Sequence, residues 1–67
     1  MNTNLFKSYM VKNGDTQADL ARELNLPQSA VSARINGRIE FKKNEINIIR
    51  KRYQLTDAET ILIFFAD

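Results

Sequence analysis

The sequence predicts an all-α fold of five short helices around a single core. Apolar residues recur at the spacing of one helix face in five segments, and no run alternates polar and apolar residues as a strand would. The two glycines, Gly14 and Gly37, and the single proline, Pro27, all fall between these segments. Sixty-seven residues make one domain, 1–67, with a core so small that association with a partner subunit would stabilise it.

The first two predicted helices cover residues 4–12 and Gln17–Leu24. The first ends at Asn13 and Gly14, two residue types that tolerate a left-handed backbone. Thr16 is expected to cap the second helix with its hydroxyl group. The inward faces carry apolar side chains at helical spacing, namely Leu5, Phe6, Tyr9 and Met10 in the first helix and Leu20, Ala21 and Leu24 in the second.

Only residues 25–27 separate the second helix from a third, Gln28–Ile35. This connection is too short for antiparallel packing and predicts two helices that cross steeply, as in a helix-turn-helix. Val31 and Ile35 are expected to point inward, so that the other side of the third helix projects from the domain. Its outward residues are short or small and uncharged, as the reading of base edges in the major groove of DNA requires: Gln28, Ser29, Ser32 and Ala33.

The fourth predicted helix is Lys43–Tyr53, and Thr56 with Glu59 forms a capping box that starts the fifth. Four apolar residues share one face of this last helix: Ala58, Ile61, Leu62 and Phe65. Ile63 and Phe64 point away from that stripe. Because a single helix cannot bury apolar side chains on every side against its own domain, we expect Ile63 and Phe64 to form a protein interface.

Charge is distributed unevenly along the chain. Residues 1–33 are neutral overall, residues 34–52 carry seven bases and two acids, and residues 53–67 carry three acids and no base, which gives a net charge of +2. This polarity predicts that one part of the molecule faces an anionic polymer. Five side chains beside the third helix are expected to contact DNA phosphates: Arg34, Asn36, Arg38, Lys42 and Lys43.

The composition excludes several classes of function. The chain has no cysteine and no histidine, so it lacks thiolate and imidazole metal ligands and the usual general base. We therefore expect no enzyme activity, no cofactor, no metal and no small-molecule substrate. The N-terminus does not resemble a signal peptide, and the longest apolar run is only six residues, 61–66. We expect no membrane association and a cytoplasmic location.

Residues 17–36 resemble the helix-turn-helix of the lambdoid phage repressor and Cro proteins, the XRE-type family. The resemblance is carried by the small residue Ala21, by a set of apolar positions and by three short motifs: Leu20, Leu24, Leu26 and Val31, with T-Q at 16–17, Q-S-A-V-S at 28–32 and N-G at 36–37. The ending L-T-x-x-E-x-x-x-x-F-F at 55–65 looks like small Cro-like regulators of temperate phages of Gram-positive bacteria. Two positions depart from the family pattern: Asn25 stands where glycine is usual, and Arg34 replaces a large apolar residue.

The resemblance implies a five-helix, lambda-repressor-like DNA-binding domain. It implies a Cro-like transcriptional repressor that binds an operator in double-stranded DNA and controls the lytic/lysogenic switch. A homodimer on a pseudo-palindromic operator would place its recognition helices about 34 Å apart. By the same resemblance, Gln17 would contact a phosphate and brace Gln28.

Two other interpretations stay open. The chain could keep the helix-turn-helix fold and act as an antirepressor, or modulator, that binds a second phage repressor protein through its helix-turn-helix or its apolar C-terminal surface. The low net charge and the apolar C-terminal segment favour this interpretation. An antitoxin role is weaker, because the sequence shows no extra segment to wrap a toxin.

Overall fold

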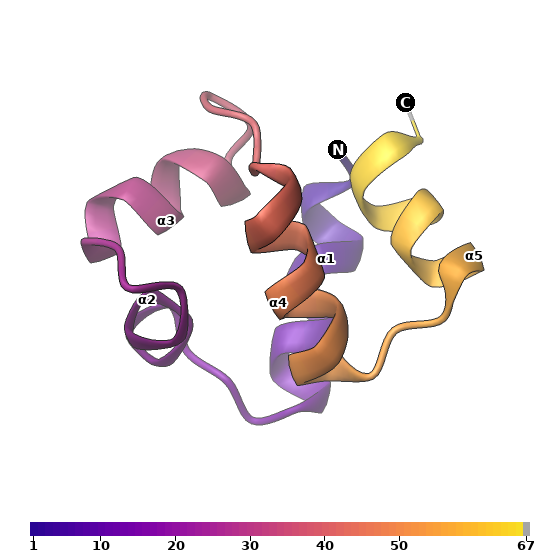
Figure 1. Ribbon diagram of the computed structural model, residues 1–67, viewed down its shortest axis with the longest axis horizontal. Helices are drawn as coiled ribbons and strands as arrows, with labels where there is room; N and C mark the ends of the chain where they lie inside the picture. The colour runs from indigo at the N-terminus through magenta and orange to yellow at the C-terminus, as the bar shows by residue number, and fades with distance from the viewer. Residues whose placement is uncertain (67) are drawn as a thin grey trace.

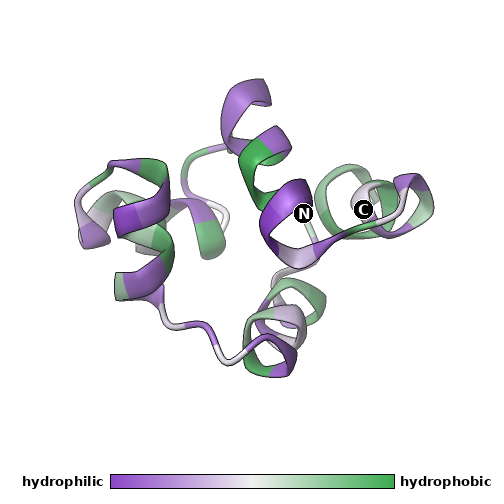
Figure 2. Cartoon of the chain, turned by 60° about the horizontal axis from the view of Figure 1, so that its bottom comes forward, coloured by the Kyte–Doolittle hydropathy of each residue, from purple (hydrophilic) through white to green (hydrophobic). Residues whose placement is uncertain are grey.

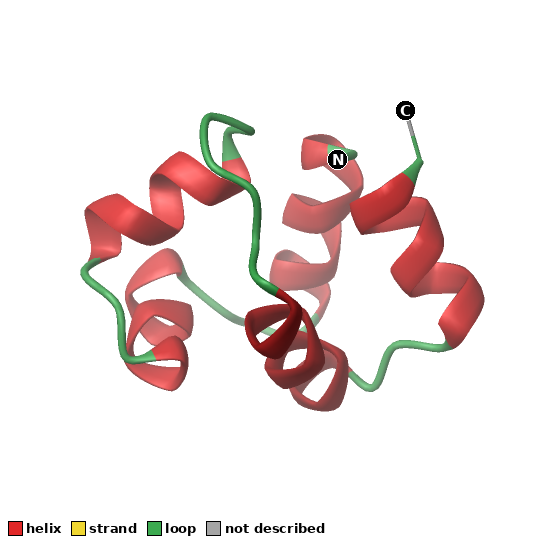
Figure 3. Cartoon of the chain, turned by 45° about the horizontal axis from the view of Figure 1, so that its top comes forward, coloured by secondary structure: helices red, strands yellow, loops and turns green. Residues whose placement is uncertain are grey.

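The computed structural model describes residues 1–66, and these form helices connected by short loops, with no strand among them (Figures 1 and 3). The elements are α1 (Thr3–Lys12), α2 (Gln17–Leu24), α3 (Gln28–Ile35), α4 (Lys43–Tyr53) and α5 (Asp57–Thr60), with α5 continuing as the π-helical segment η1 (Ile61–Phe65). The predicted all-α, helix-turn-helix fold class is confirmed. None of the described helices is long and apolar enough to span a bilayer.

The predicted bounds of α2, α3 and α4 are confirmed. Thr16 and Asp19 cap the start of α2, whereas α3 begins after Pro27 without a side-chain cap. Helix α1 begins one residue earlier than predicted, where the Asn2 side chain accepts a hydrogen bond from the Leu5 amide at 3.1 Å. Asn25 has the expected left-handed backbone, with φ of 55°. Gln54 adopts the same conformation after α4, which the sequence did not indicate.

The helices lie in three groups across the molecule (Figure 1). Helices α2 and α3 occupy one side, α4 runs through the middle with α1 behind it, and α5 with η1 occupies the other side. The two ends of the chain meet, because the Asn2 amide donates to the Ile63 carbonyl at 2.7 Å. The C-terminal helix is therefore held against α1 and lies away from α2 and α3.

Six apolar side chains from five elements are almost fully buried between these groups: Phe6, Leu20, Val31, Ile35, Ile49 and Ile63. Phe6 lies at the centre of an aromatic cluster. Its ring stacks on Phe41 with centroids 5.5 Å apart, and it meets Tyr53 and Phe64 edge-on at 6.3 and 5.8 Å. These aromatic contacts join α1, α4 and η1 through the loop that precedes α4.

The predicted orientation of the last helix is wrong. Ile63 is 1% exposed, and Phe64 packs against Phe6 and Phe41. The exposed side chains are instead Ile61, Leu62 and Phe65, at 56, 55 and 67%. Apolar residues cover both sides of η1 (Figure 2), so counting them does not identify the buried side.

The side chain of Thr60 explains why the inward side of the last helix differs from the predicted one. Thr60 is buried on the same side of the helix as Ile63, and its hydroxyl donates to the Thr56 carbonyl at 2.9 Å. That local bond satisfies the hydroxyl and lets a polar residue occupy the inward face. The stripe with the largest number of apolar residues is therefore the exposed one.

A carboxylate joins the α1–α2 loop to the end of α4. The Asp15 side chain is 5% exposed and accepts hydrogen bonds from the Arg52 guanidinium at 2.7 and 2.9 Å and from the Tyr53 hydroxyl at 2.6 Å. The hydrogen bonds from Arg52 hold the pKa of Asp15 below its ordinary value, against the opposing effect of burial. Burial and the neighbouring carboxylate raise the pKa of Tyr53.

Asp15→Asn is expected to lower the free energy of unfolding by about 2 kcal/mol near neutral pH, because Arg52 and Tyr53 lose a charged acceptor. The folded-state pKa of Asp15 is lowered, so its contribution is present above the unfolded value of 3.8 and is lost as the pH falls below it. Urea unfolding near pH 7 and near pH 3 should therefore show a difference between wild type and variant that shrinks in acid. Glu40→Gln, which removes an exposed carboxylate, is the control; a difference independent of pH would contradict the prediction.

Candidate nucleic-acid interface

The α2–α3 unit is defined by local hydrogen bonds. Thr16 and Asp19 cap α2 reciprocally: the Thr16 hydroxyl accepts from the Asp19 amide at 3.1 Å, and the Asp19 carboxylate accepts from the Thr16 amide at 3.0 Å. The left-handed Asn25 turns the chain, and the Leu26 amide donates to the Ala21 carbonyl at 3.0 Å. Helix α3 then begins directly after Pro27 and packs closely on α2.

Helix α3 presents its predicted base-reading residues outward. Val31 and Ile35 have no exposed surface, because they point into the core. Gln28 and Ser29 are exposed, and Ser32 and Ala33 are half-buried on the flank of the helix. The outward surface thus consists of one amide, two hydroxyls and a methyl group, without any charge.

Polar and basic side chains of the α3–α4 loop lie next to this surface, where the Arg38 amide donates to the Ala33 carbonyl at 2.9 Å, and a further predicted contact, Gln17, begins α2. We call four of these residues the polar rim: Gln17, Asn36, Arg38 and Lys42. Gln17 is half-buried and the other three are exposed. The Asn36 amide group also donates to the Ser32 hydroxyl at 3.3 Å, so it closes the end of α3 as well.

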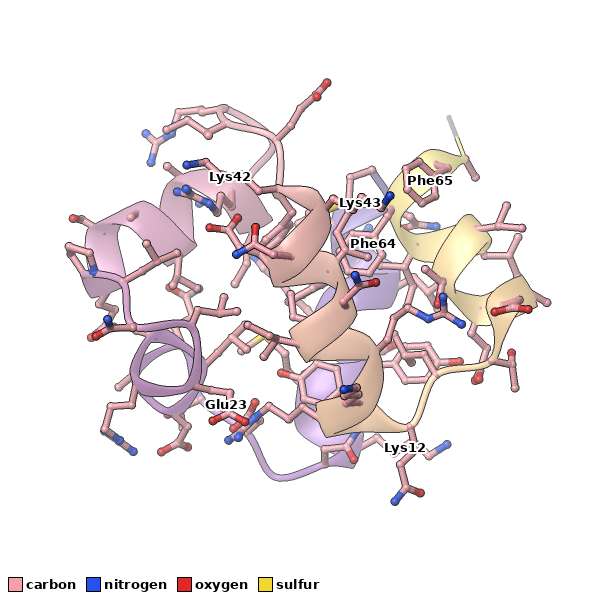
Figure 4. The ribbon with its side chains drawn as sticks, viewed as in Figure 1. Lys12, Glu23, Lys42, Lys43, Phe64 and Phe65 are labelled. Atoms are coloured by element: carbon pink, nitrogen blue, oxygen red, sulfur yellow. The ribbon has the colours of Figure 1, made fainter. Side chains whose placement is uncertain are left out.

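The neighbouring residues Lys42 and Lys43 point to opposite sides of α4 (Figure 4). Lys42 extends toward α3, whereas Lys43 extends toward Phe64 and Phe65 in the C-terminal helix. A groove lined by Lys43, Phe65 and residues of α4 lies on that second side. The structure therefore does not bring the predicted phosphate contact Lys43 together with the polar rim.

Arg34 is not placed for the phosphate contact that the sequence suggested. The residue is only 7% exposed, and its guanidinium points into the domain. It donates to the Glu45 carboxylate at 3.0 and 3.4 Å and to the Ala30 carbonyl at 3.1 Å. Its departure from the apolar family pattern therefore reflects a buried ion pair, and Arg34 leaves the set of candidate phosphate contacts.

The basic run at 50–52 is engaged mainly within the domain. Arg50 pairs with Asp57 at the start of α5. Arg52 pairs with Asp15 at 2.7 Å and lies 3.7 Å from Glu23. Two of the three cations of this run are thus paired with acids of the same chain. The cations next to α3 are therefore Arg38 and Lys42 of the polar rim.

Comparison with known proteins adds one finding. A family described as helix-turn-helix matches residues 6–59, a span from α1 into α5. No curated protein and no solved structure matches the chain. The match ends before η1, so the exposed residues Ile61, Leu62 and Phe65 lie outside it.

Proposed function

The chain belongs to the helix-turn-helix family of DNA-binding regulators, and on that premise we propose that it is a single-domain, sequence-specific transcriptional regulator. The observation that supports this proposal is the outward surface of α3. Gln28 and Ser29 are exposed there, while Val31 and Ile35 fix the opposite side of the helix in the core. An uncharged polar surface on a projecting helix suits the major groove, where each base pair presents its own pattern of donors and acceptors.

Each outward residue has a role in this proposal. Gln28, the first residue of α3, donates to N7 and accepts from N6 of an adenine. Ser29 and Ser32 donate to or accept from neighbouring base edges, and Ala33 contacts a thymine methyl group. Gln17 contacts a phosphate and braces Gln28.

The polar rim supplies the contacts that do not depend on sequence. Lys42→Ala is expected to lower the slope of log affinity against log salt concentration by about 0.9 for each bound copy, because one phosphate contact is lost. Lys43→Ala is the matched control, since the adjacent lysine points to the other side of α4. Fluorescence anisotropy titrations over a range of salt concentrations would measure both slopes. Equal slopes for the two variants would contradict the assignment of Lys42 to the rim.

We further propose that the protein binds as a homodimer, as a Cro-like phage repressor would. The apolar face, which we define as Ile61, Leu62 and Phe65, is more than half exposed at each residue. These residues belong to η1, which lies across α4 from α2 and α3 (Figure 1), and Phe65 also borders a pocket that Arg34 and Gly37 line. Two copies joined through this face would carry their recognition helices outward, as half-sites about 34 Å apart require. The interface residues proposed from the structure thus replace Ile63 and Phe64.

Leu62→Asp is expected to weaken self-association at least tenfold, because a charge replaces an apolar contact worth about 1.5–3 kcal/mol. Sedimentation equilibrium, with and without operator DNA, would measure the change. Val11→Asp is a suitable control, since Val11 is 80% exposed on α1, outside the apolar face. A wild-type protein that stays monomeric even on DNA would refute the homodimer.

Selection of bound sequences from random duplex DNA at near-physiological salt tests the proposed function directly. Enrichment of a motif is the expected result, and the spacing of repeated half-sites would give the geometry of the dimer. Repression then requires that the motif overlap a promoter, which a reporter assay would establish. Without any enriched motif, sequence-specific DNA binding would be abandoned.

The apolar face also favours the second candidate function, that of an antirepressor that binds another repressor protein. The two candidates respond differently to substitution. A DNA-reading regulator loses activity with Gln28→Ala. An antirepressor keeps its activity with that variant and loses it with Leu62→Asp.

A further inference from the structure

A buried ion pair joins the recognition helix to α4, and none of the proposed DNA contacts uses it. Arg34 of α3 and Glu45 of α4 are 7% and 5% exposed. The guanidinium donates through Nε to Oε1 of Glu45 at 3.0 Å and through Nη2 to Oε2 at 3.4 Å. Nη1 donates to the Ala30 carbonyl in the same helix at 3.1 Å, so all three nitrogens of the guanidinium are engaged.

The same carboxylate also organises the start of α4. Oε1 of Glu45 accepts a hydrogen bond from the Lys42 backbone amide at 2.8 Å. Burial alone would raise the pKa of Glu45, but the bonds from Lys42 and Arg34 together lower it, so the carboxylate is ionised at neutral pH. The Glu45 carboxylate therefore connects Arg34 of α3 to the backbone of Lys42, whose side chain belongs to the polar rim.

Other connections between α3 and α4 are sparse. Helix α3 packs closely on α2, but it makes few close backbone approaches to α4. Within residues 1–66, the other side-chain hydrogen bond that reaches α3 from a distant element is that of the Thr3 hydroxyl to the Ile35 carbonyl, at 2.8 Å. That bond holds the C-terminal end of α3 to α1. Toward α4, α3 is held by the apolar packing of Val31 and Ile35 in the core and by the ion pair, and only the ion pair has a directional geometry.

Buried ion pairs stabilise a fold poorly, because the cost of removing both charges from water offsets their attraction. Apolar residues of similar volume often replace them without loss of stability, and their best-attested use is to select one arrangement among several. We propose that Arg34 and Glu45 are positioning residues that fix α3 relative to Lys42, and that they thereby set the specificity of DNA recognition. This inference rests on the proposed function, since specificity presupposes that α3 reads bases.

The test compares the double variant Arg34→Met/Glu45→Met with wild type. Its denaturation midpoint should stay close to that of wild type, because the gain from replacing a buried ion pair with apolar side chains offsets the loss of the hydrogen bond to the Lys42 amide. The ratio of affinities for the selected site and for random duplex should fall at least tenfold, while the affinity for random duplex should change less than about threefold. Arg50→Met/Asp57→Asn, which removes an exposed ion pair between α4 and α5, should leave the ratio unchanged. A stable double variant with the ratio of wild type would overturn the proposal.

Arg34→Lys provides a second variant, because it keeps the charge and loses the planar fork that spans both carboxylate oxygens. Arg34→Lys should fold, and its ratio of affinities for the selected site and for random duplex should be at least threefold lower than that of wild type. A folded variant with the ratio of wild type would overturn the proposal. If neither variant folds, the pair serves folding itself, which also overturns it.

Amide hydrogen exchange gives a readout that does not depend on DNA. Exchange should accelerate in α3 of the double variant and stay unchanged in α1. If wild type selects no sequence but α3 loosens in this way, the proposed function fails while the positioning of α3 stands. Unchanged exchange throughout α3 would reject the positioning role itself.

Discussion

Phe6→Ala is expected to leave much of the protein unfolded at room temperature. Phe6 is 1% exposed, and three other aromatic rings surround it. Truncation of a buried phenylalanine to alanine costs about 3–5 kcal/mol, the sum of lost apolar burial and of the cavity that remains. Small domains have a total stability toward the low end of about 5–15 kcal/mol, so this loss takes most of it. Urea unfolding followed by circular dichroism would measure the change.

Phe65→Ala is the matched control for that experiment. The substitution is chemically identical, but Phe65 is 67% exposed. Its effect should stay within about 0.5 kcal/mol of wild type when measured at concentrations where the protein is monomeric. If both variants lose the same stability, the aromatic cluster around Phe6 is not the centre of the core.

The contrast between these two phenylalanines shows where sequence reasoning succeeds. Phe6 lies on a helix with one clearly apolar side, and helical spacing alone predicts its burial. The helix that contains Phe65 is apolar on both sides, so the same criterion cannot decide which side faces inward. Contacts with the rest of the fold decide which side of this helix faces inward. The Ile63 carbonyl accepts a hydrogen bond from the Asn2 amide, and the Phe64 ring packs against Phe6 and Phe41.

In the candidate nucleic-acid interface, too, local sequence predicts some positions and only tertiary contacts determine others. The outward position of Gln28 follows from the turn at Asn25 and from the inward spacing of Val31 and Ile35, all of which are local features. The burial of Arg34 depends on Glu45, eleven residues later in another helix. No local pattern specifies that pairing, because it requires the crossing of α3 and α4. The available signal was that Arg34, a charged residue, stands where the family pattern has an apolar one. That departure is compatible with an ion pair to an acid of the next helix as well as with a phosphate contact.

Gln28→Ala is expected to have the largest effect on DNA binding. The side chain is exposed at the first residue of α3, where docking of a recognition helix aims it at base edges. A bidentate contact to adenine contributes about 1–3 kcal/mol of discrimination, and two half-sites of a dimer double it to about 2–6 kcal/mol. Affinity for the selected operator should therefore fall by about 30-fold or more. The fold should be unaffected, because alanine is a good helix former at an exposed position.

Two measurements separate base reading from a general loss of affinity. On operators with each base pair changed in turn, Gln28→Ala should lose the preference for adenine at one position of each half-site and keep the others. Its salt dependence should match that of wild type, because no phosphate contact changes. Asn47→Ala, an exposed amide on α4, should change neither quantity. If Gln28→Ala keeps both the motif and the affinity of wild type, α3 does not read bases through this residue, and binding of a second repressor through the apolar face becomes the leading function.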